Sequence, residues 1–124
     1  MSMSTIVDRI NNLSSTLFFL EGHIARLQVA RDEADLKLDQ LRSAQRDAYE
    51  HGHKWPGPEL QMLEEAKVAF RDARLDLEGA QRDQCRFLEA LGEAEGELKK
   101  AKLDHKRDAR NKPLTGRPFA ALLG

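Results

Sequence analysis

Two histidines one residue apart, His51 and His53, are the residues of this chain whose spacing comes closest to suggesting chemistry. They lie in the stretch HGHKWPGPE, residues 51–59. Imidazole nitrogens bind transition metals, and Glu50 or Glu59 is close enough in sequence to add a carboxylate. A metal site needs three or four ligands, however, and a His-x-His pair without a third His or a Cys nearby is a weak signal. We therefore predict no metal site here.

Catalytic chemistry would need other motifs, and the sequence lacks them. It contains no glycine-rich phosphate loop and no Gly-x-Ser-x-Gly motif. Its many carboxylates fall on solvated helix faces, where nothing desolvates them to raise a pKa. The one cysteine, Cys85, cannot form an internal disulfide, and its place beside a helical seam suits a small, weakly polar residue. We predict that the protein is not an enzyme and has no catalytic residues and no cofactor.

The elements that must position any site are two long helices, because apolar residues recur in steps of three and four along most of the chain. The first series, which we call the first seam, consists of Ile6, Ile10, Leu13, Leu17, Leu20, Ile24, Leu27, Arg31, Ala34, Leu38, Leu41, Gln45 and Ala48. Thr5 and Asp8 resemble a capping box, and no proline follows until Pro56. The spacing predicts one helix over about residues 5–50.

A second series of the same spacing follows the histidine-rich stretch. This second seam consists of Leu63, Ala66, Phe70, Ala73, Leu77, Ala80, Gln84, Phe87, Leu91, Ala94, Leu98 and Ala101. Pro58 suits the first turn of a helix, where its missing N–H would have been unpaired anyway. Asn111, followed by a lysine and a proline, is typical of a helix end. The spacing predicts a second helix over about residues 59–111.

These elements predict an all-α fold, a long antiparallel two-helix coiled-coil hairpin. A corner at 51–58 is too short to return the chain for parallel pairing. We expect the hairpin to span residues 1–112 and an extended C-terminal tail to span 113–124. So thin a hairpin is expected to offer no pocket of the size that substrates need.

Two polar residues, Arg31 and Gln84, interrupt the otherwise apolar seams. If the chain folds back near residue 55, position 31 lies opposite about position 80, so the two side chains are expected to be close enough to meet. A polar contact of this kind specifies register. The alternative is that the long arginine side chain simply extends to water.

The corner has two interpretations, which differ in the role of Trp55. In the first, Gly52 ends the first helix, Pro56 prevents its continuation, and Trp55 folds over the apolar end of the seams near Leu60 and Leu63. In the second, Trp55 is exposed at the tip as a recognition hot spot. We favour the first and keep Trp55 as a candidate partner-binding residue.

The turn Trp55-Pro56-Gly57 resembles the Trp-x-Gly turn of the small helical-hairpin proteins exported by type VII secretion. The resemblance covers three residues and implies a helical hairpin that pairs into a four-helix assembly. The chain departs from that family in its longer arms, in the prolines around the turn and in lacking the tyrosine-based C-terminal export signal, since its only tyrosine is Tyr49. In shape the predicted hairpin is also similar to stalk and chaperone hairpins of flagellar and type III secretion systems and to phage-encoded accessory proteins.

A second apolar face lies beside the first seam. Its members, which we call the apolar stripe, are Phe18, Phe19, Ala25, Val29 and Leu36. A two-helix hairpin leaves this stripe exposed, and exposed apolar patches usually mark a contact. Three occupants remain open: the chain's own tail, a second copy that forms a four-helix bundle, or a different protein. The tail residues predicted to bind a partner are Phe119, Leu122 and Leu123.

Charge is distributed unevenly along the chain. The sequence has 20 Lys or Arg and 21 Asp or Glu, yet residues 99–124 hold eight of the basic residues and only two of the acidic ones. The candidates for phosphate binding are Lys99, Lys100, Lys102, Lys106, Arg107 and Arg110. Cations near a helix C-terminus also interact favourably with the helix dipole, so a solvated helix end is the competing interpretation, which we favour.

The overall composition points to a protein that works by binding. Its 33% charged and 40% hydrophobic residues suit long exposed helices, and no run approaches the roughly 20 apolar residues of a membrane span. The N-terminus lacks the pattern of a secretory signal, so we expect a cytoplasmic protein. We predict a non-enzymatic adaptor, chaperone or assembly factor that binds another protein. The alternative is a nucleic-acid-associated protein that contacts phosphates through the basic segment 99–117.

Overall fold

The computed structural model describes residues 2–111. Its side chains are described up to residue 109. The predicted tail, 113–124, and with it Phe119, Leu122 and Leu123, lies outside the described residues, as does the side chain of Arg110.

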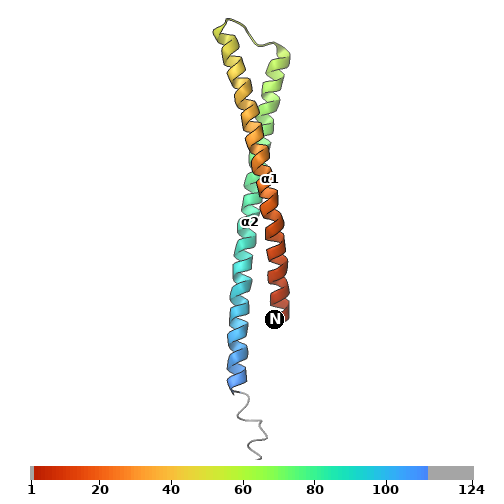
Figure 1. The fold of residues 1–124 in the computed structure, drawn as a ribbon, viewed down its shortest axis with the longest axis vertical. Coiled ribbons are helices and arrows are strands. Elements are labelled where there is room, and N and C mark those ends of the chain that lie inside the picture. The colour runs from red at the N-terminus through yellow and green to blue at the C-terminus, as the bar shows by residue number, and fades with distance from the viewer. Residues whose placement is uncertain (1, 112–124) are drawn as a thin grey trace, which may run out of the picture. The chain divides into compact units, whose positions relative to one another are not determined.

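Two long helices account for nearly all of the described chain. Helix α1 spans Met3–Glu50 and helix α2 spans Gly57–Asn111, and residues 2–111 contain no strand. The prediction of an all-α helical hairpin is confirmed. In Figure 1 the short corner joins the end of α1 to the start of α2.

Helix α1 begins two residues before its predicted start because Ser2, and not Thr5, caps it. The Ser2 Oγ accepts a hydrogen bond from the backbone N–H of Thr5 at 3.2 Å, and the Ser2 carbonyl accepts one from the N–H of Ile6 at 3.2 Å. A serine hydroxyl that binds the N–H three residues later is the usual N-cap arrangement. The Thr5 hydroxyl lies 2.8 Å from the Ser2 hydroxyl, so Thr5 belongs to the first turn.

Helix α1 ends in a Schellman motif centred on Gly52. The N–H of His53 donates to the carbonyl of Ala48 at 2.8 Å, and the N–H of Gly52 donates to that of Tyr49 at 3.0 Å. Gly52 has a φ of 74°, the left-handed conformation that glycine adopts without the steric cost of a Cβ. The expectation that Gly52 ends the first helix is therefore confirmed.

Helix α2 begins at Gly57, two residues before the predicted start. The carbonyl of Pro56 accepts a hydrogen bond from the N–H of Leu60 at 3.1 Å, which places Pro56 at the N-cap. Pro58 then lies in the first turn, as predicted, where a missing N–H leaves no bond unmade. Glu59 also lies in this turn, where a carboxylate interacts favourably with the positive end of the helix dipole.

The chain packs as two units, which we treat separately. The corner unit comprises residues 18–85, and the terminal unit comprises residues up to 17 together with those from 86 onward. In the corner unit, α1 runs into the corner and α2 returns along it (Figure 1). In the terminal unit, the first turns of α1 pack on the later turns of α2, and Arg9 forms an ion pair with Glu97 at 3.4 Å.

Two small clusters form the core of the corner unit. In one, Ile24 of α1 packs with Leu77 and Ala80 of α2, and Leu20 and Leu27 lie against them. In the other, nearer the corner, Leu38 packs with Leu63 and Ala66, and the residues lying against them are Leu41, Trp55 and Phe70. In the terminal unit, Ile6 and Ala94 are buried. Every residue of the two predicted seams is buried or partly buried.

The predicted meeting of Arg31 and Gln84 is wrong. Since Ile24 packs on Leu77 and Leu38 packs on Leu63, Arg31 faces α2 midway between these contacts, roughly 21 Å along the axis from Gln84. Arg31 instead forms an ion pair with its neighbour Asp32 at 2.9 Å. A symmetrical fold about residue 55 would pair the helices differently, but the packing at Leu38 and Ile24 sets the register.

Candidate functional site: an exposed apolar stripe on α1

The apolar stripe lies exposed on α1 in the corner unit. Phe18 and Phe19 expose 75% and 76% of their surface, and Val29 and Leu36 expose 57% and 59%. Ala25 is exposed as well. Burial of apolar surface stabilises a fold by about 25 cal/mol for each Å² removed from water. Because these four large side chains are mostly exposed, they contribute little to the stability of the fold. Their exposure, predicted from the sequence, makes them the first candidate for a binding surface.

The stripe follows one line along the helix. At 100° per residue, Ala25, Val29 and Leu36 all lie within about 20° of Phe18 around the axis of α1. Ile24, which packs on α2, lies about 120° away around the same axis. The contact between α1 and α2 therefore leaves the stripe uncovered within the corner unit.

Phe19 lies at the edge of this line, about 100° around the helix from Phe18. The two rings nevertheless contact each other edge to face, with centroids 6.4 Å apart and an angle of 76° between their planes. Aromatic pairs favour this arrangement because the positive edge of one ring meets the negative face of the other. The pair forms a single aromatic knob at the start of the stripe.

Trp55, the third predicted partner-binding residue, is partly buried in the corner. Its side chain packs against the cluster of Leu38, Leu63 and Ala66. This is the arrangement that the first interpretation of the corner predicts, in which Trp55 folds over the apolar end of the seams. Trp55 thus covers the end of the corner-unit core, and only the remaining exposed part of its surface is open to a partner.

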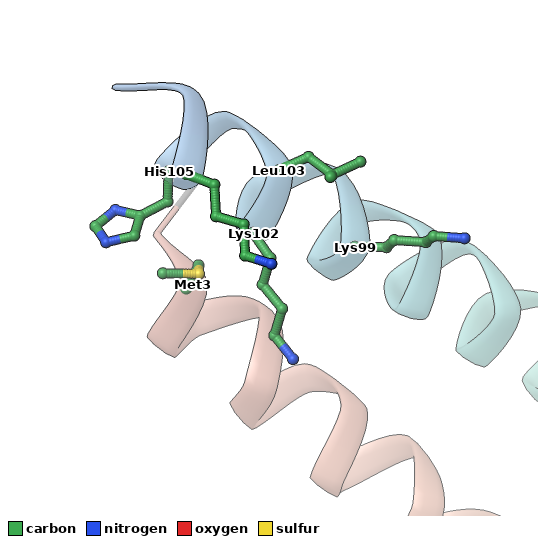
Figure 2. Close-up of a pocket in the computed structure, with 6 residues that line it drawn as sticks. Met3, Lys99, Lys102, Leu103 and His105 are labelled. Carbon is green, nitrogen blue, oxygen red and sulfur yellow. The ribbon is translucent and has the colours of Figure 1, made fainter. Parts of the chain in front are cut away.

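The basic residues near the end of α2 line a groove of about 350 Å³ in the terminal unit. Lys99, Lys102 and Lys106 line it together with Met3, Leu103 and His105. Figure 2 shows Met3, on the first turn of α1, facing the turns of α2 that carry Lys102 and His105. Lys100 and Arg107, also predicted as phosphate-binding residues, do not line the groove.

A second depression, of about 430 Å³, lies in the corner unit. Its charged lining includes Arg31, paired with Asp32, and Arg74, whose Nε lies 3.9 Å from Glu78. Both depressions are open to solvent along the helix surface and do not enclose a ligand as substrate pockets do, so the expectation about substrate pockets stays a prediction. Side chains of different lengths leave hollows along the helices that an apolar pattern does not predict.

The side chain of His51 has a local structural role in the corner. The ring Nδ1 of His51 donates a hydrogen bond to the carbonyl of Asp47 at 2.7 Å, which helps to bind the last turn of α1. Within residues 2–109, no group of three or more His, Cys, Asp or Glu side chains is arranged to hold a metal ion.

Cys85 is a free, exposed thiol. Neither helix, over its described length, has a segment long and apolar enough to cross a membrane.

Sequence reasoning missed the apolar part of the basic groove. Met3 and Leu103 line it, and Leu103 is exposed although it is a large apolar residue. Leu103 lies two residues after Ala101, the last residue of the second seam, and this off-seam position in a basic run is a signal that the sequence contained. The contribution of Met3 had no such signal, since it depends on which turns of the two helices meet.

Comparison with protein-family models, curated proteins and solved structures finds no match for this chain.

Proposed function

We propose that the protein is a non-enzymatic protein–protein interaction module, an adaptor, chaperone or assembly factor. The observation that carries this proposal is the exposure of Phe18 and Phe19, about three-quarters of each side chain, at the start of a straight apolar stripe. Large aromatic side chains are frequent hot spots at protein interfaces, and a rigid helix presents them at little entropic cost. The partner surfaces include this stripe, the exposed part of Trp55 and the tail residues Phe119, Leu122 and Leu123.

The proposal includes a location in the cytoplasm. The thiol of Cys85 is free and exposed, which suits a compartment that keeps thiols reduced.

Affinity capture tests the proposal. The tagged full-length chain is recovered from its native cytoplasm after nuclease treatment, beside a version that ends at Lys112. The proposal predicts a protein retained in stoichiometric amount despite the nuclease, and loss of that protein on truncation assigns contact to the tail. Retained material that disappears with nuclease would contradict it.

A second candidate function is association with nucleic acid. The observation that favours it is the row of Lys99, Lys102 and Lys106 along one groove, spread over about 10 Å of helix. No acidic residue is among the described residues that line this groove. Contacts between lysines and phosphates would be independent of sequence and would weaken steeply with salt.

Charge reversal separates the two functions. Glutamate at Lys99, Lys102 and Lys106 is expected to abolish retention on DNA or RNA at low salt if the second function holds. The matched control reverses Lys100 and Arg107, which lie in the same segment outside the groove and are expected to lower retention less. A nucleic-acid role for the groove would be excluded if all three proteins were retained equally. It would also be excluded if the unaltered chain were not retained at all.

A further inference from the structure

The apolar stripe has the spacing of a second coiled-coil seam. With Gly22 added, the stripe residues Phe18, Ala25, Val29 and Leu36 follow one another at steps of four, three, four and seven residues, and Asp32 occupies the heptad position between the last two. Heptad spacing of this kind matches the surface of another long helix better than it matches a compact, curved surface. The helix α2 of the same chain packs on the first seam instead, so the second seam needs a helix from elsewhere.

The chain's own tail is too short to cover the whole stripe. In the terminal unit the ion pair of Arg9 with Glu97 fixes which turns meet. Leu17 lies eight residues from Arg9 in one direction and Asn111 lies fourteen residues from Glu97 in the other, which separates them by about 33 Å along the axes. Phe119 is eight residues beyond Asn111, and even a fully extended chain of that length spans only about 27 Å. Phe119 therefore falls short of the residue that precedes Phe18. Leu122 and Leu123, eleven and twelve residues beyond Asn111, span about 40 Å at full extension, which reaches the start of the stripe but not Val29 or Leu36.

A second copy of the chain fits the alternation of large and small side chains along the stripe. Next to the large Phe18 lie Gly22 and Ala25, whose small size leaves a hollow in the helix surface. A Cβ added at Gly22 would meet only the end of the Arg26 side chain, at 3.7 Å, so the space above this residue is open. If two α1 helices cross antiparallel with Gly22 opposite Ala25 of the second copy, each Phe18 lies over the other copy's Val29, and the backbones can approach closely.

The charges beside the stripe favour this antiparallel pairing. It brings Phe19 next to Arg26 of the second copy, an aromatic ring beside a guanidinium. On the opposite edge, Glu21 lies beside Gln28, which avoids a contact between like charges. A parallel pairing would place the two Asp32 side chains opposite each other in the contact, whereas the antiparallel pairing separates them by about 26 Å.

The exposed apolar area of the stripe, if all of it were buried, sets an upper limit close to what a specific contact needs. Phe18 and Phe19 at three-quarters exposure offer roughly 150 Å² each, and the same stripe adds Val29 and Leu36. Counted over two copies, the apolar side chains alone approach the roughly 1,000 Å² above which interfaces are usually specific.

We propose that the apolar stripe binds a second copy of this chain, with the two α1 helices antiparallel and Gly22 of each opposite Ala25 of the other. This inference rests on the proposed function, since it names the occupant of one of its partner surfaces. It leaves the exposed part of Trp55 and the tail for a different protein.

Sedimentation equilibrium of the purified full-length chain tests the occupant directly. The expected mass is twice the 14.1 kDa of one chain. Phe18→Asp/Phe19→Asp is expected to sediment as a single chain with an unchanged circular dichroism spectrum. The matched control, Leu75→Asp, replaces an exposed leucine of α2 and is expected to remain a dimer. A monomeric unaltered chain, or a dimer that Phe18→Asp/Phe19→Asp leaves intact, overturns the proposal.

Disulfide cross-linking tests the orientation in a chain whose Cys85 is replaced by serine. A mixture of Gly22→Cys and Ala25→Cys chains is expected to cross-link on oxidation. Val29→Cys alone is expected not to, because the antiparallel pairing separates the two Val29 residues by about 17 Å, beyond the reach of a disulfide. Cross-linking of Val29→Cys to itself would show a parallel pair and overturn the proposal. A monomeric chain that loses a different protein on Phe18→Asp/Phe19→Asp would overturn this inference alone and leave the proposed function standing.

Discussion

Phe18 and Phe19 are neighbours in sequence, yet their rings meet edge to face with centroids 6.4 Å apart, and each side chain remains about three-quarters exposed. Successive helical residues point about 100° apart, so such a pair spans a wide arc of the surface of α1. One ring lies on the apolar stripe and the other at its edge. The arrangement presents two contacting aromatic rings to solvent, and the proposed function depends on them.

Leu38 and Leu36 differ in what they contribute to the fold although they are two residues apart. Leu38 is 2% exposed in the core of the corner unit, whereas Leu36 is on the stripe. Leu38→Ala is expected to lower the free energy of unfolding by about 3 kcal/mol, through lost burial and a cavity. Leu36→Ala is expected to change the free energy of unfolding of the single chain by less than about 0.5 kcal/mol. Chemical denaturation followed by circular dichroism, at a concentration where the chain is monomeric, measures both; equal losses would contradict the assigned faces.

The small residues of the second seam set how closely α1 and α2 approach. Ala66 is 4% exposed and packs with Leu38 and Leu63. Ala66→Leu is expected to lower the free energy of unfolding by about 1–3 kcal/mol, since the added methyl groups have no space. Ala69→Leu, on the exposed side of the same helix, is the control and is expected to be near neutral. Thermal unfolding compares them, and a stabilising Ala66→Leu would show that the interface is loosely packed.

Gly52 is the residue of the corner whose backbone conformation requires glycine. Its φ of 74° places a Cβ in a strained position, so Gly52→Ala is expected to lower the free energy of unfolding by about 1 kcal/mol. Gly92→Ala, within α2, is the matched control. Gly92 has no positive φ, and an added Cβ there meets open space, so alanine is expected to be neutral or stabilising. Denaturant titration of the two variants checks this, and similar effects at both glycines would argue against the Schellman motif.

Ser2 is expected to hold the first turn of α1 in place. Ser2→Ala removes the hydroxyl that accepts the N–H of Thr5 and is expected to cost about 1 kcal/mol of helix stability. Amide hydrogen exchange at Thr5 and Ile6 should become faster, while exchange at Ile24, in the corner unit, stays the same. Unchanged exchange at Thr5 would indicate that the hydroxyl does not cap the helix.

The sequence patterns predicted which residues face inward, and did less well on where the two helices meet. Heptad spacing depends only on the 3.6-residue period, so residues as different as Ile6, Arg31 and Ala94 were all placed on the correct faces. Axial register depends on how particular side chains fit together. A count from the corner therefore put Arg31 near residue 80, whereas the packing of Leu38 on Leu63 puts it opposite about residue 70.

The candidate site likewise has a part that the sequence could predict and a part that it could not. The exposure of Phe18 and Leu36 was predictable, because residues outside a seam have no second helix to cover them. The groove beside Met3 and Leu103 was not, since it exists only when the first turn of α1 lies against the late turns of α2. Trp55 was given two roles by the sequence, and its packing on the end of the core supports the structural one.

The most direct test of the central claim is capture, after nuclease treatment, by three tagged chains: the unaltered protein, Phe18→Asp/Phe19→Asp and Leu75→Asp. An untagged copy is expressed alongside, so that binding of a second copy is counted as well as binding of a different protein. The account predicts that the unaltered chain and Leu75→Asp retain at least one protein that Phe18→Asp/Phe19→Asp loses. Retention of the same proteins in the same amounts by all three chains would contradict it.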